Sequence, residues 1–269
     1  MPDLLVAGTC DYRSLGRSIH PSVEKGVANV DLRKMTFGYP VAVVGICTFI
    51  QRAVSRGEHV SFHCPDSDDA ANYLARARLA RILETSGIAH DLPRVREHGV
   101  GDSLFELRAF NAVSHVEELA VHLEKIIGQG DAAAATLYTV LVASGENFIE
   151  HSGASAGYLM AQRTHRDGRV HFAVGDAGVG LLETLSGRGA NNDKEALDLA
   201  LQAGMSRLDA RGRGNGLREL ADRAVDTGGS LTLESGTYLR TESARGSSSI
   251  RHRRPIAGTL VSGSFPSAR

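Results

Sequence analysis

The chain has 269 residues, with 30 lysines and arginines against 31 aspartates and glutamates. Its net charge of −1 gives no overall field that would attract nucleic acid or an anionic membrane. The longest apolar stretch, 41–50, is too short to cross a bilayer, which takes about 20 residues, and residues 1–10 lack the features of a signal peptide. The three cysteines show no CxxC spacing, which suits a reducing compartment. We therefore expect a soluble, cytoplasmic protein.

The N-terminal third alternates between strand and helix patterns. Strands are predicted over 27–32 and 58–64, and helices over 41–54 and 70–84. The first helix is expected to bury Val43, Ile46, Ile50 and Val54. This β-α-β-α order favours an open sheet with helices packed on it.

The remaining two thirds follow a segment with prolines and glycines, 92–103, which we interpret as an inter-domain link. Strands are predicted over 105–110, 170–174, 230–234 and 259–265. Helices are predicted over 113–127, 132–151, 193–203 and 216–226, the third capped by Asn192 or Asp193. The sequence thus predicts an α/β protein of two domains, 1–95 and 102–269.

A first cluster of polar residues lies near the end of the predicted helix 132–151. Asn147 and His151 are four residues apart and therefore share one helix face. An asparagine amide oxygen is a suitable hard ligand for Mg²⁺, which keeps several waters and also binds phosphate oxygens. The neighbouring Glu146 is a weak candidate for a catalytic group.

A second cluster, 174–180, reads VGDAGVG and follows a predicted buried strand. The carboxylate of Asp176 is suited to accept a hydrogen bond from an exocyclic amine, which selects adenine over guanine. Gly178 and Gly180 let the backbone approach a planar base, because no Cβ stands in the way.

A third cluster, 211–220, places alternate glycines directly before a helix. It contains Gly212, Arg213, Gly214, Asn215, Gly216 and Leu217. Unpaired N–H groups and the positive end of the helix favour a triphosphate there, and Arg213 adds a charge. The glycines match neither a P-loop nor a dinucleotide-binding fingerprint.

Taken in order, the three clusters resemble the N, G1 and G2 boxes of the gyrase, chaperone, histidine-kinase and mismatch-repair (GHKL) ATPases. The resemblance covers roughly 102–266 and includes a last strand that begins after Gly258. It implies a histidine-kinase-like domain, a two-layer α/β sandwich (the Bergerat fold), holding ATP and Mg²⁺. It also implies that Asn147 holds Mg²⁺, Asp176 the adenine amine and the third cluster the phosphates, that Thr259 assists at the base through water, and that 181–211 is a mobile lid.

The sequence departs from this family at one position. The family usually has a glutamate four residues before the asparagine, where it acts as a general base or positions Mg²⁺; here that residue is Ala143. Glu146 and Glu150 lie about one and two turns further along the helix and do not occupy the same place. We therefore expect ATP binding with little or no turnover.

The N-terminal part resembles a STAS domain, the anti-sigma-antagonist fold, over roughly 3–92. The resemblance rests on the segment 31–40, DLRKMTFGYP, followed by a helix, and on the segment 73–79. STAS regulators commonly carry a phosphorylatable serine or threonine before that helix, whereas Pro40 and Val41 stand here. A generic βα module packed on the ATP domain is the alternative.

Three further candidates carry less weight. His59 and His63 point away from Cys64 on their predicted strand, which argues against a shared metal site. His115 lacks the residues that follow a phosphoacceptor histidine in histidine kinases. The basic, serine-rich segment 240–254 is expected to be a solvated, partly disordered loop; its basic residues are Arg240, Arg245, Arg251, His252, Arg253 and Arg254.

The functional hypothesis is a signalling regulator of the histidine-kinase or anti-sigma type, in which the nucleotide controls binding of a protein partner. One alternative is a serine or histidine protein kinase of the anti-sigma type. Another is a nucleic-acid-associated ATPase using the arginine-rich segment, although the low aromatic content of 5% does not favour nucleic acid. No membrane partner is expected, and the oligomeric state, including a homodimer, stays open.

Overall fold

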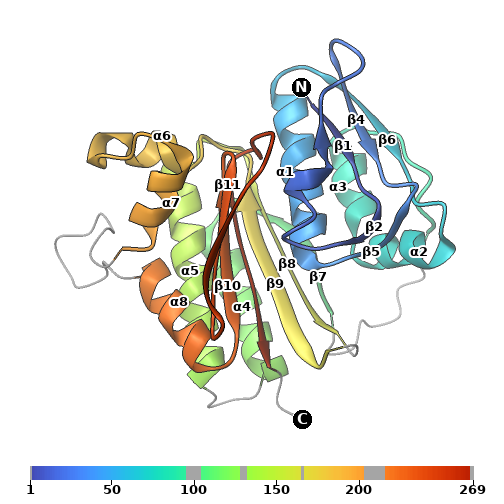
Figure 1. Cartoon of the computed structure of the whole chain (residues 1–269). Helices are drawn as coiled ribbons and strands as arrows, with labels where there is room; N and C mark the ends of the chain where they lie inside the picture. Colours follow the sequence, from blue (N-terminus) through green and yellow to red (C-terminus); the bar gives the residue numbers. More distant parts are fainter. Residues whose placement is uncertain (1, 95–103, 128–131, 165–166, 203–215, 267–269) are drawn as a thin grey trace.

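The computed structural model describes residues 2–94, 104–127, 132–164, 167–202 and 216–266 (Figure 1). It is a mixed α/β structure with small N-terminal mixed sheets and helices, followed by a seven-stranded antiparallel sheet packed against helices. Within these ranges no helix is both long and apolar enough to span a membrane.

The N-terminal part contains a four-stranded sheet in the order β3-β1-β4-β6 and a parallel pair, β2-β5. Its strands are β1 (Asp3–Leu5), β2 (Gly8–Cys10), β3 (Ile19–His20), β4 (Val27–Asp31), β5 (Met35–Gly38) and β6 (His59–His63). Its helices are η1 (Gly16–Ser18), α1 (Pro40–Ser55), α2 (Asp68–Arg76) and α3 (Leu79–Thr85). The parallel neighbours β4 and β6 are joined through β5 and α1, as the alternating strand and helix patterns predict, and β4 also pairs in parallel with β1.

The large sheet has the order β12-β11-β10-β13-β9-β8-β7, and every neighbouring pair is antiparallel. Its strands are β7 (Leu104–Phe110), β8 (Gly157–Thr164), β9 (Arg169–Asp176), β10 (Ser230–Ser235), β11 (Tyr238–Ser243), β12 (Gly246–Arg251) and β13 (Thr259–Pro266). Strand β9, which ends at Asp176, lies in the interior of this sheet and is paired on both sides over its whole length.

Three long helices cover one face of the large sheet (Figure 1): α4 (Val113–Ile127), α5 (Ala132–His151) and α8 (Gly216–Asp226). Gly145 explains how α4 and α5 come so close, because a Cβ at this position would lie 2.7 Å from the Val116 side chain. The shorter α6 (Leu181–Leu185), η2 (Ser186–Arg188) and α7 (Asp193–Ala200) form a separate small cluster beside β10 and β11. We call the helix-covered side the helical face.

Helix α1 covers the opposite side of the large sheet, which we call the N-terminal face (Figure 1). The helix also packs on β4, β5 and β6, so it lies between two sheets. Consequently its residues from Pro40 to Ile50 are all buried, rather than one stripe of them. Val43, Ile46 and Ile50 are buried as predicted, whereas the prediction for Val54 is wrong, since its side chain is 44% exposed.

Polar contacts also join the N-terminal part to the large sheet. The Tyr73 hydroxyl donates to Gln162 at 2.9 Å, and the amide of Gln51 donates to Ser155 at 3.1 Å. Arg78 lies 3.0 Å from Glu106 in an ion pair. One continuous core includes residues of α1 together with residues of β8, β9 and β13. The predicted domain boundary, near 95–102, falls on residues outside the described ranges.

The single helix predicted over 70–84 is in fact two helices, α2 and α3. Arg78 between them has a left-handed backbone with φ of 69°. This break frees the carbonyl of Ala77 to accept a hydrogen bond from the N–H of Leu107 on β7, at 3.0 Å. A tertiary contact therefore overrides a continuous helical pattern.

The expectation of a partly disordered loop over 240–254 is also wrong, because β11 and β12 form a regular hairpin that extends the large sheet. Arg240 does not belong to a free basic surface: it is paired with Glu242 on its own strand and with Asp198 on α7. His252 is fully buried and lies against Glu234. The other arginines of this segment are exposed.

Candidate functional site

Asp176 occupies the last position of β9, on the helical face of the sheet. Its side chain is buried, and one carboxylate oxygen accepts a hydrogen bond of 2.7 Å from the N–H of Gly178. Burial raises the pKa of Asp176 to about 6, while backbone hydrogen bonds from Gly178 and Thr259 act in the opposite direction. Near neutral pH the group is therefore mostly an ionised acceptor, fixed in one orientation at the end of a strand.

The loop after Asp176 is held against the end of α5. The N–H of Val179 donates to the carbonyl of Ser152 at 3.0 Å. A Cβ at Gly178 would lie only 2.0 Å from that same carbonyl oxygen, so only glycine fits here. The first and second sequence clusters, far apart in the chain, thus meet through backbone contacts.

Strand β13 brings a third segment to the same place. Thr259 is the direct partner of Asp176 across β9 and β13. The preceding Gly258 has a φ of 64°, and a Cβ there would lie 2.0 Å from the carbonyl oxygen of Asp176. The Ser235 hydroxyl donates to the carbonyl of Gly258 and accepts from the N–H of Leu181. This serine therefore holds the loop that contains Gly180.

The backbones of Asn147 and His151 lie in the last part of α5, as predicted, and their side chains lie outside the described residues. Ala143 is half-buried one turn before Asn147, and Glu146 is half-buried directly before it. Next to Ala143, the buried hydroxyl of Ser144 has no hydrogen-bond partner among the described residues.

Most of the third cluster, from Gly212 to Asn215, falls outside the described residues. What the structure describes is its end: α8 begins at Gly216, where a helix start was predicted. Leu217 in its first turn packs against the core beneath the helical face, and α8 lies next to α5. The start of α8 thus belongs to the same helical layer as Asn147 and His151.

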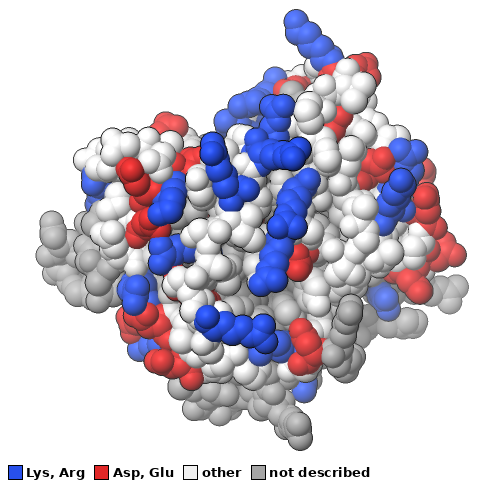
Figure 2. All heavy atoms as spheres, viewed as in Figure 1, with Lys and Arg blue, Asp and Glu red and all other residues white. Residues whose placement is uncertain are grey.

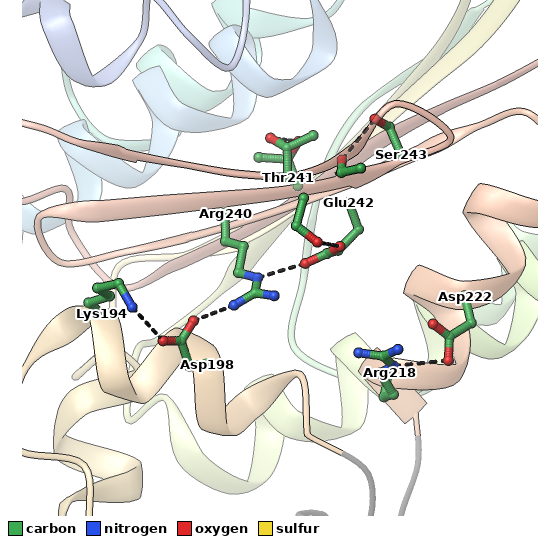
Figure 3. Close-up of polar contacts among 11 residues, drawn as sticks. Lys194, Asp198, Arg218, Asp222, Arg240, Thr241, Glu242 and Ser243 are labelled. Atoms are coloured by element: carbon green, nitrogen blue, oxygen red, sulfur yellow. Dashed lines mark hydrogen bonds and ion pairs between the residues drawn. The ribbon is translucent and has the colours of Figure 1, made fainter.

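The described part of the predicted lid, 181–202, is attached to the sheet. Asn192 caps α7, as expected, by accepting from the N–H of Glu195. The carboxylate of Asp193 accepts from both the N–H and the hydroxyl of Thr237, at 2.8 and 2.6 Å. Figure 3 shows a second attachment, in which Asp198 joins Lys194 to Arg240 on β11. These contacts fix α7 to the turn and strand that follow β10.

The remaining candidates do not form a site of their own. His115 lies in α4, and its buried Nδ1 has no hydrogen-bond partner within the described ranges. Among the described residues no group of three or more histidine, cysteine or acidic side chains is arranged to hold a metal ion.

Comparison of the chain with protein-family models, curated proteins and solved structures found no match. The function is therefore inferred from the arrangement of the residues themselves.

That arrangement is a buried carboxylate at a strand end, ringed by three glycines and two serines. Sequence patterns single out Asp176, Gly178 and Gly180, but they do not single out Ser152 and Ser235, whose roles are to bond the loops. Serines are common at the ends of strands and helices, so their presence there does not predict a role in a site. The partner of each serine, a loop distant in sequence, becomes visible only in the fold.

Proposed function

We propose that this chain binds ATP with Mg²⁺ at the end of β9, as a signalling regulator of the GHKL type, with little or no hydrolysis. The observation that carries the proposal is the buried, ionisable carboxylate of Asp176, fixed by Gly178 and next to Thr259. A fixed acceptor in a buried position discriminates strongly between a base that offers an amine and one that offers a carbonyl.

The neighbouring elements suit the rest of the nucleotide. Gly178 and Gly180 let the loop after Asp176 pack closely against Ser152 and Ser235, which fixes the loop beside the carboxylate. The end of α5, which carries Asn147, is bonded to the same loop through Ser152. The start of α8 at Gly216 suits phosphate, because the first N–H groups of a helix have no acceptor within the helix itself. In this proposal Gly212, Arg213, Gly214 and Asn215 complete the phosphate site, Leu217 packs beneath it, and His151 lies one turn beyond the Mg²⁺ ligand Asn147.

Ala143 is the reason for proposing slow turnover. A methyl group neither accepts a proton from water nor positions a metal-bound water. Glu146 lies about one turn further along the helix and does not occupy the place of Ala143. Nucleotide occupancy then acts as a switch only if ATP binds two conformations with different affinity. The segment 181–211 is the element proposed to change, with a STAS-like N-terminal part and a protein partner as the remaining components.

The direct test is isothermal titration calorimetry of the full chain with ATP, ADP and GTP, with and without Mg²⁺. We expect ATP to bind at micromolar to millimolar concentration, more tightly with Mg²⁺, and in preference to GTP. Asp176→Asn should reduce ATP affinity by about tenfold or more and weaken the preference over GTP, because an amide is a poorer acceptor than a carboxylate.

A pair of variants separates a local effect from general damage. Gly178→Ala places a methyl group against the Ser152 carbonyl and should reduce ATP binding, whereas Ser248→Ala, at an exposed position on β12, should leave it unchanged. The proposal fails if the folded parent chain takes up no ATP at millimolar concentration. Hydrolysis at the rate of an ordinary GHKL ATPase would overturn the part that depends on Ala143.

A further inference from the structure

The last strand of the large sheet, β12, has one unpaired side. It bonds to β11 on its inner side, and within the described ranges no strand lies along its outer side. The hairpin closes at Ser243 and Gly246 around a two-residue turn. Because hydrogen-bonded and non-bonded pairs alternate along an antiparallel ladder, Ser247, Ser249 and Arg251 direct their N–H and C=O groups outward. These groups form a template for another strand.

Strand β12 lacks most of the devices that block such pairing. It is a full six residues long, roughly 20 Å at about 3.3 Å per residue. It contains no proline and no bulge, and its three central serines are exposed. Its only charged residue, Arg251, lies at the end of the strand with its guanidinium near the Tyr238 ring. The middle of this edge is therefore accessible to an incoming backbone.

Arginines surround this edge at both ends. Arg245 lies in the turn before β12, and Arg251, Arg253 and Arg254 lie at its far end, all of them exposed. Arg17 joins the far-end group, because its neighbour Gly16 lies against the ring of His252, where a Cβ would be 2.5 Å away. Figure 2 shows basic side chains gathered on this face of the molecule, with few acidic ones among them. Across the described residues, none of these five arginines has a carboxylate partner.

We propose that the outer edge of β12 binds an extended, acidic segment of a partner protein by strand addition. The backbone of the segment would continue the sheet, and its carboxylates would pair with the arginines at the two ends of the strand. Arginine suits this role, because its planar fork binds a carboxylate through two parallel hydrogen bonds.

The same features disfavour two other occupants. A second copy of this chain, paired antiparallel through its own β12, would place arginines against arginines at both ends of the new ladder. A nucleic acid would meet not only arginines but also the outward carbonyl oxygens of the strand, which repel phosphate. The described residues next to β12 also present no exposed aromatic ring on which a base would stack.

The proposal is testable with the full chain and a fluorescein-labelled peptide that alternates threonine with glutamate. We expect saturable binding by fluorescence anisotropy that weakens with salt. Ser249→Pro removes one outward N–H while leaving the inner ladder to β11 intact, and should weaken binding by about three- to tenfold. Ser249→Ala keeps that N–H and should bind like the parent.

Charge is tested separately by Arg253→Glu combined with Arg254→Glu, which should weaken binding by about tenfold or more at low salt. Circular dichroism spectra that match the parent would establish that each variant is folded. Equal binding of the same peptide with N-methylated backbone would overturn strand addition, as would an unchanged affinity in Ser249→Pro. Tighter binding of a short DNA duplex than of the peptide would overturn the choice of partner.

Discussion

The two faces of the seven-stranded sheet are covered in different ways. The helical face is covered by α4, α5 and α8, which lie in the same part of the sequence as the strands of the sheet. The N-terminal face is covered mainly by α1, which is distant in sequence and also packs on the smaller N-terminal strands β4, β5 and β6. Helix α1 is buried from Pro40 to Ile50 because it packs on elements of both parts of the molecule, so this burial depends on the tertiary structure of the whole molecule.

The faces also differ in what they bury. On the N-terminal face Glu234 lies beneath the surface with His252, and neither side chain is exposed by more than 1%. Their nearest atoms are 2.9 Å apart, within ion-pair distance, although the geometry is not that of a hydrogen bond. On the helical face the buried carboxylate is Asp176, and its partners are backbone N–H groups. One acid thus lies against a side chain, and the other is bonded by backbone N–H groups.

The largest effect is expected from His252→Ala. Removing one member of a buried pair leaves the Glu234 carboxylate without its partner, which costs about 3–5 kcal/mol. Burial already raises the pKa of Glu234, and the loss of His252 raises it further. Such a group binds protons more tightly in the folded state, so the destabilisation should grow as pH rises above the ordinary carboxyl pKa. Urea denaturation at pH 5 and pH 8 measures both effects.

The control is a histidine whose acidic partner is nearer the surface. His171 lies 2.9 Å from Asp167, with side chains 18% and 33% exposed, and His171→Ala should cost less than His252→Ala. Adding Glu234→Gln to His252→Ala removes the uncompensated charge and should recover part of the stability at pH 8. Equal losses in the two histidine variants would mean that the N-terminal face does not depend on its buried pair.

A matched pair of leucines compares the two faces directly. Leu260 belongs to the core shared with α1, Leu233 to the core beneath the helical layer, and each is 1% exposed. Replacing either by alanine should cost about 2–5 kcal/mol, through lost burial and the cavity that remains. If the faces form one cooperative unit, both variants should shift a single unfolding transition. Two separate transitions, of which Leu260→Ala shifts only one, would show instead that the faces unfold independently.

The smallest effect concerns Asp176 and its pH dependence. Its folded pKa of about 6 lies above the ordinary value of 3.8, so the folded state holds this proton more tightly. Without nucleotide, this group alone should reduce stability as pH rises from about 4 to 6, by up to about 3 kcal/mol. Asp176→Asn should lack this part of the slope and should be the more stable form at pH 8. Identical slopes in parent and variant would show that the carboxylate is not effectively desolvated.

Much of the helical layer can be predicted from the sequence. The bounds predicted for α4 and α5 match the structure, because apolar residues that recur with a helical period over a long segment are a clear signal of a helix. The clusters around Asp176 and Gly216 also fall where predicted, at a strand end and a helix start. The spacing of glycines identifies such positions, because glycine is needed wherever the backbone passes close to another group, and this need is visible in the local sequence.

Strands β8 and β12 were not predicted, because neither has an alternating apolar and polar pattern. Strand β8 is covered on both faces, so its side chains do not alternate between apolar and polar. Strand β12 is exposed along most of its length and contains three serines in a row, so it has no apolar pattern either. Both strands form through pairing with neighbours. The pattern of a single sequence does not show which strands pair. It also does not show that α1 is buried on two sides.

Helix α7 is fastened to the β10–β11 turn by Asp193 and to β11 by Asp198. Strand β11 is also the inner partner of β12. A movement of α7 therefore either breaks these hydrogen bonds and this ion pair or displaces the hairpin together with α7. By thermodynamic linkage, a partner bound to the hairpin then changes the free energy of moving α7. The movement of α7 changes the binding free energy of that partner by the same amount.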